Sequence, residues 1–152
     1  MKTFNTAGPI VKKDHYFVDP LKRWDMSEVM GLINNHKYFL LHAPRQTGKT
    51  TCLFSLRDKL NEEGKYCAIY TNFEGATAVR EDIDQVNSII TSVLLTRVQR
   101  LKIDNFDIEK AVSFSKSIEA NMRFGEVLAY LAENISKPVV VFIDEADALI
   151  GD

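Results

Sequence analysis

The chain has few cysteines and no strong charge of either sign, and both absences narrow its function. Its 152 residues include only 2 cysteines, Cys52 and Cys67, which belong to no CxxC pair and no Cys/His cluster. We therefore expect two buried free thiols, no structural metal and a cytoplasmic location. The formal net charge of -2 leaves no overall basic field, so neither nucleic acid nor a membrane surface is indicated as a partner.

Long apolar runs are also missing. No stretch reaches the ~18 apolar residues that a membrane span needs, and the first ten residues lack the apolar core of a signal peptide. There is no internal repeat and no low-complexity tract. The composition that remains, 45% apolar and 26% charged residues, is ordinary for a globular domain with a sizeable core.

Apolar side chains recur in patterns that predict helices and strands in alternation. The expected helices cover about 26–35, 51–63, 79–101, 108–113 and 118–135, and the expected strands cover about 37–42, 66–70 and 139–143. This alternation predicts an α/β fold with a mostly parallel sheet. We expect residues 1–24 to be an irregular lead-in segment and residues 25–152 to be the domain.

The most informative stretch lies between the first expected strand and the helix after it. It contains Gly48-Lys49-Thr50, and the order of strand, tight loop, Gly-Lys-Thr and helix is that of a phosphate-binding loop. Gly48 lets the backbone pass close to a phosphate, Lys49 can reach the β- and γ-phosphates, and the Thr50 hydroxyl can ligate Mg²⁺. The alternative is a polar turn without a ligand, which the flanking strand and helix disfavour.

The residues around this triplet complete the predicted nucleotide-binding segment. Backbone N–H groups and a helix N-terminus from Arg45 to Thr51 suit an anion, whereas Pro44 has no N–H and only stiffens the approach. The predicted segment comprises Pro44, Arg45, Gln46, Thr47, Gly48, Lys49, Thr50 and Thr51. Ala43 stands where the usual pattern has glycine, and it is tolerated there if its φ is negative.

Two acidic residues, Asp144 and Glu145, follow directly after the apolar strand at 139–143. In open α/β sheets, ligands bind at the carboxyl ends of the strands. Hydrolysis of a nucleotide needs a carboxylate near Mg²⁺ and a group that acts on water. We expect Asp144 to hold Mg²⁺ together with Thr50, and Glu145 to be catalytic together with Lys49. The alternative is that Asp144 and Glu145 are simply solvated side chains at the end of a strand.

Weaker candidates lie at the same predicted sheet edge and in the lead-in segment. Asn72 and Glu74 follow the second expected strand and could help to place water, although plain loop residues are more common there. Phe17 and Val18 could pack on an adenine base or simply join the core. The three histidines, His15, His36 and His42, have no ligand spacing.

Residues 38–51 resemble the Walker A segment of bacterial AAA-like ATP-binding proteins, which belong to the AAA+/STAND group of P-loop NTPases. Residues 142–149 resemble their Walker B segment, and Ala43-Pro44-Arg45 fits a variant of the loop in such proteins. The resemblance covers most of the chain. It implies a three-layer α/β/α fold, ATP and Mg²⁺ as ligands, ATP hydrolysis, and a homo-oligomer or a protein partner.

The resemblance stops near Asp152, where the family pattern would continue with a sensor strand, an arginine finger and a lid. In that group, the sensor strand separates the two motif strands. We therefore expect either a sheet that is incomplete at the C-terminus, in a truncated and slow or inactive ATPase, or direct pairing of the strands at 37–42 and 139–143. The alternative function is a nucleotide-dependent interaction switch with little turnover, whose helix at 79–101 contacts a partner.

Overall fold

The computed structural model describes residues 3, 13, 14, 16, 19–42, 44 and 47–149. They fall into two compact units, Met1–Leu56 and Arg57–Asp152. Several predicted positions lie outside the described residues, namely Phe17 and Val18 of the lead-in segment and Ala43, Arg45 and Gln46 of the loop. No helix within the described ranges is both long and apolar enough to cross a membrane.

The described residues of the first unit form the 3-10 helix η1 (Pro20–Arg23), α1 (Met26–Asn34) and the first turns of α2 (Lys49–Glu63). Helix α1 begins after Asp25, whose side chain accepts hydrogen bonds from the backbone N–H groups of Ser27 and Glu28. This satisfies two donors that a helix start leaves without an intrahelical partner. Val29 and Ile33, one turn apart, are buried. The helix predicted at 26–35 is confirmed to within one residue.

The strand predicted at 37–42 is wrong. These residues belong to no strand, and the Tyr38 and Leu40 side chains are 105% and 86% exposed. Strand propensity alone forms no strand, because the ladder of hydrogen bonds needs a neighbouring chain segment. Within the part of the chain that the structure describes, the sheet has only two strands, and this segment pairs with neither of them. Direct pairing of 37–42 with 139–143 is therefore wrong as well.

The second unit is an α/β arrangement with two parallel strands. Its elements are β1 (Cys67–Asn72), η2 (Glu74–Val79), α3 (Ile83–Leu101), α4 (Ile108–Ser117), α5 (Arg123–Asn134), β2 (Val139–Asp144) and η3 (Ala146–Leu149). The register runs from Cys67 opposite Val139 to Asn72 opposite Asp144. The predicted α/β class and parallel pairing are confirmed, and the two strands end level with each other at their carboxyl ends.

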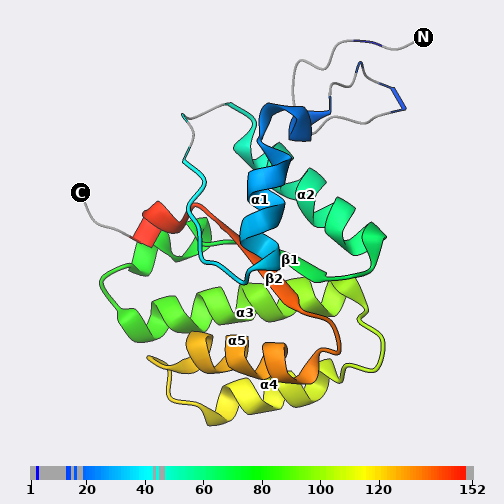
Figure 1. The fold of residues 1–152 in the computed structure, drawn as a ribbon. Coiled ribbons are helices and arrows are strands. Elements are labelled where there is room, and N and C mark those ends of the chain that lie inside the picture. The colour runs from blue at the N-terminus through cyan, green and yellow to red at the C-terminus, as the bar shows by residue number, and fades with distance from the viewer. Residues whose placement is uncertain are drawn as a thin grey trace. The chain divides into compact units, whose positions relative to one another are not determined.

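Helices α3, α4 and α5 lie on one side of the two strands (Figure 1). They bury one apolar core with the strand residues, made of Cys67, Ile69, Leu94, Leu95, Val98, Ala111, Val127, Leu131 and Ile135. Several boundaries differ from the predicted ones. Helix α3 begins at Ile83 because Asp82 caps it, α4 extends to Ser117, and the residues predicted as a loop after β1 form the 3-10 helix η2.

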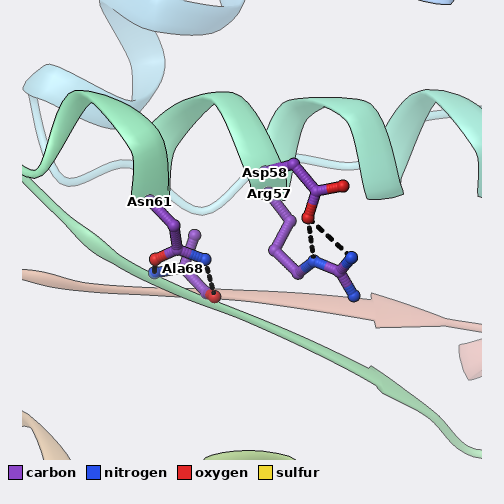
Figure 2. Close-up of polar contacts among 4 residues, drawn as sticks. All are labelled: Arg57, Asp58, Asn61 and Ala68. Carbon is purple, nitrogen blue, oxygen red and sulfur yellow. Dashed lines mark hydrogen bonds and ion pairs between the residues drawn. The ribbon is translucent and has the colours of Figure 1, made fainter. Parts of the chain in front are cut away.

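One backbone edge of β1 is occupied by a side chain (Figure 2). The Ala68 N–H donates to Asn61 Oδ1 at 2.9 Å, and Asn61 Nδ2 donates to the Ala68 carbonyl at 2.8 Å. Asn61 thereby supplies the donor and the acceptor that a further strand would offer at this residue, which protects a strand edge. The neighbouring ion pair of Arg57 and Asp58, 2.6 Å long, is partly exposed, so it adds little stability.

Candidate functional site

The candidate phosphate loop ends in a glycine with a left-handed backbone. Gly48 has a φ of +83°, and α2 begins at the next residue, Lys49. The positive φ favours glycine, whereas a Cβ at Gly48 would meet only Arg23 Nη1 at 3.4 Å, the end of a flexible side chain. Lys49 and Thr50 thus occupy the first turn of a helix, where backbone N–H groups and the helix dipole favour an anion.

An arginine that the sequence patterns did not single out holds this loop. Arg23 Nη1 donates to the Thr47 carbonyl at 2.9 Å, and Thr47 Oγ1 donates to the Pro44 carbonyl at 2.7 Å. The carbonyl and the N–H of a trans peptide point in opposite directions. Arg23 therefore turns the Gly48 N–H away from itself. Arg23 precedes Thr47 by 24 residues, and no spacing pattern links the two.

The two thiols are buried and free, as predicted. Cys52, in the first turns of α2, donates from Sγ to the Pro20 carbonyl at 3.4 Å. Burial raises the pKa of Cys52, while the positive charge of Arg23 acts in the opposite direction. Burial also raises the pKa of Cys67 in β1. Both groups are thiols rather than thiolates at neutral pH, which makes them poor nucleophiles.

The predicted metal ligand Asp144 is the last residue of β2, and it is only 2% exposed. Three of its oxygens accept hydrogen bonds: the backbone oxygen from the Phe73 N–H at 3.1 Å, Oδ1 from the Glu145 N–H at 3.1 Å, and Oδ2 from the Tyr70 hydroxyl at 3.0 Å. A buried carboxylate needs such donors to offset its loss of hydration. Burial, aided by the Asp144 charge, raises the pKa of Tyr70 to about 12, so its hydroxyl keeps its proton and donates at neutral pH.

The predicted catalytic residue Glu145 has a φ of +54°. For a residue with a Cβ, the left-handed conformation costs about 1–2 kcal/mol. Two of the other described non-glycine residues with positive φ, His36 and Lys102, lie just beyond helix ends, whereas Glu145 directly follows a strand. Backbone strain of this kind concentrates at functional sites. Glu145 is half-buried.

The weaker candidates lie at the same strand ends. Asn72 is opposite Asp144 in the register, and its Oδ1 accepts a hydrogen bond from the Glu74 N–H at 2.6 Å. Asn72 therefore shapes the turn into η2, and Glu74 is exposed at the start of that turn. Asp147, in η3, is also exposed.

The side chains at the start of α2 and those at the end of β2 are each of a kind that binds a nucleotide or a hard cation. A lysine ammonium, a threonine hydroxyl and a carboxylate are the groups that bind phosphates and Mg²⁺ in proteins. Within the described ranges, no three His, Cys, Asp or Glu residues gather as a metal-binding group. Mg²⁺ does not require one, because it keeps several waters and takes one or two protein ligands plus phosphate oxygens. The loop belongs to the unit Met1–Leu56, and the acidic pair belongs to the unit Arg57–Asp152.

Comparisons of this chain with protein-family models, with curated proteins and with solved structures gave no match. The function of the chain is therefore inferred from its residues alone. The most informative features are the helix start at Lys49 and the carboxylate pair at the end of β2.

Proposed function

We propose that this chain binds ATP with Mg²⁺ and hydrolyses the nucleotide as an AAA-like P-loop ATPase domain. The observation that carries the proposal is the left-handed Gly48 followed at once by a helix that begins with Lys49 and Thr50. This conformation brings backbone N–H groups, an ammonium and a hydroxyl to one helix start, which is the chemistry of a triphosphate site. The proposal includes the three-layer α/β/α fold of P-loop NTPases.

Each residue has a separate role in the proposed reaction. The N–H groups from Gly48 to Thr51 bind phosphate oxygens, and Lys49 neutralises charge that develops on the γ-phosphate. Thr50 and Asp144 would hold Mg²⁺, which would supply positive charge to neutralise the phosphate oxygens. Glu145 orients a water molecule for in-line attack on the γ-phosphorus.

Calorimetric titration with MgATP tests the nucleotide site. Lys49→Ala should lower the affinity at least ~100-fold, since it removes a charge-assisted contact to phosphate. Lys59→Ala is the matched control, because Lys59 lies on the same helix, is exposed and makes only a 4.0 Å surface ion pair with Glu63. A Lys49→Ala variant with wild-type affinity would show that the site is assigned to the wrong residues.

Phosphate release separates hydrolysis from the alternative, a nucleotide-dependent interaction switch with little turnover. The ATPase proposal expects steady release by the wild-type chain and none by Glu145→Gln, with MgATP affinity retained in both. Binding without release by the wild-type chain would favour the switch. That result would leave the assignment of Lys49 intact and remove the catalytic role of Glu145.

A further inference from the structure

We propose that Tyr70 is a positioning residue that orients the Asp144 carboxylate for Mg²⁺. The inference depends on the proposed function in one respect, the assignment of Asp144 as a metal ligand. Its own basis is a buried hydrogen bond between two strands: the Tyr70 hydroxyl lies 3.0 Å from Asp144 Oδ2. Neither the Walker pattern nor the apolar periodicity of the strand predicts this contact.

The strand register explains how Tyr70 reaches the carboxylate. Tyr70 is opposite Phe142 in the register, and Asn72 is opposite Asp144. Residues two positions apart on a strand share a face of the sheet, so Tyr70 and Asp144 lie on the same face. The step between these two positions is about 6.6 Å along the strand. A phenol ring can span this offset, whereas a shorter hydroxyl side chain such as serine cannot.

The two carboxylate oxygens of Asp144 have donors of different origin. The donor to Oδ1 is the backbone N–H of the next residue, Glu145, which moves together with Asp144. The donor to Oδ2 comes from Tyr70, which is 74 residues away in the sequence and belongs to the neighbouring strand. The tyrosine contact therefore ties the direction of the carboxylate to the sheet rather than to the local turn.

This tie has a consequence for metal binding. A ligand carboxylate that is already oriented by a hydrogen bond loses less freedom when it binds a hydrated cation. Tyr70 is 7% exposed and Asp144 is 2% exposed. Bulk water therefore cannot easily replace the Tyr70 hydroxyl as a donor to this carboxylate. Loss of the hydroxyl should thus weaken the Mg²⁺-dependent part of nucleotide binding and leave the phosphate contacts of the loop unchanged.

The test uses Tyr70→Phe in the full chain, which removes the hydroxyl and keeps the ring. Nucleotide binding is measured as Mg²⁺ is varied. The Mg²⁺ concentration at half-maximal binding should rise about 10-fold, the lower end of the range for lost partners of metal ligands. Affinity for ATP without Mg²⁺ should not change. Tyr66→Phe is the matched control, because Tyr66 is 3% exposed and precedes the same strand.

Two further variants separate positioning from general loosening of the fold. In an Asp144→Asn background, Tyr70→Phe should add no further change in the Mg²⁺ requirement. p-Aminophenylalanine at position 70 keeps an N–H donor where the hydroxyl lies, so its Mg²⁺ requirement should lie between those of Tyr70→Phe and the wild-type chain, and it serves as the test if thermal melts find Tyr70→Phe unfolded. Wild-type Mg²⁺ dependence in Tyr70→Phe, or an equal shift in Tyr66→Phe, overturns the role of Tyr70. A wild-type chain that binds no MgATP instead overturns the proposed function.

Discussion

Gly48 and Glu145 both have left-handed backbone, with φ of +83° and +54°, but only one of them is a glycine. At Gly48, the proposed chemistry uses backbone N–H groups, so a residue without a Cβ loses nothing. At Glu145, the proposed reagent is the side chain, so a Cβ is kept despite a strain of about 1–2 kcal/mol. In the proposed function, the strain at Glu145 is kept because the side chain of this residue acts on water.

The largest expected effect comes from substituting the strained residue. Glu145→Gly should abolish phosphate release and yet raise the free energy of unfolding by about 0.5–1 kcal/mol, because relief of strain exceeds the added flexibility of the unfolded chain. Glu145→Gln should abolish release without this gain, since it keeps the Cβ. Denaturant unfolding of both variants measures the difference. Equal free energies of unfolding for Glu145→Gly and Glu145→Gln would mean that the backbone of Glu145 is not strained, which would contradict the comparison with Gly48.

The reverse substitution at the loop has the next largest effect. Gly48→Ala should lower MgATP affinity at least ~10-fold and the free energy of unfolding by about 1–2 kcal/mol, because alanine is strained at a φ of +83°. Gly31→Ala is the control: Gly31 lies within α1 and nothing is within 4 Å of the added Cβ. Calorimetry and unfolding curves measure both variants, and a similar outcome for the two glycines would refute the special role of Gly48.

Local signals were enough to predict much of the fold. The apolar spacing predicts a helix from about residue 26, and Asp25, a residue type favoured before a helix, caps α1 in the structure. The apolar runs of β1 and β2 predict buried strands, and their parallel pairing follows from the helices between them. The Gly48-Lys49-Thr50 triplet likewise predicts a helix after the loop, and α2 begins at Lys49, two residues before the expected start at 51. In each case the signal and the structure lie within a few residues of each other.

Features that depend on distant partners could not be predicted in this way. Residues 38–41 form an unbroken apolar run like the one in β2, but pairing decides whether such a run becomes a strand, and the described residues offer it no neighbour. The contacts of Tyr70 with Asp144 and of Arg23 with Thr47 join residues 74 and 24 positions apart. The positive φ of Glu145 has no signal in residue type, because glutamate rarely adopts it.

Substitution of Arg23 should have the smallest effect, and it tests how the peptide before Gly48 is held in comparison with Glu145. Glu145 follows a strand that fixes its place, whereas the Thr47–Gly48 peptide is held by a hydrogen bond from an exposed side chain. A hydrogen bond from a charged donor is worth about 1.5 kcal/mol. Arg23→Ala should therefore lower MgATP affinity about 10-fold.

The same titration with two neighbouring variants shows whether the hydrogen bond or the charge matters. Lys22→Ala removes an exposed positive charge one residue away and should leave the affinity unchanged. Arg23→Lys keeps the charge and a single donor, so it should retain part of the affinity. Equal losses of MgATP affinity in Lys22→Ala and Arg23→Ala would mean that the positive charge near the loop matters, and not the hydrogen bond from Arg23. A loss confined to Arg23 would instead mean that the direction of one peptide, set from 24 residues upstream, governs how the loop receives a phosphate.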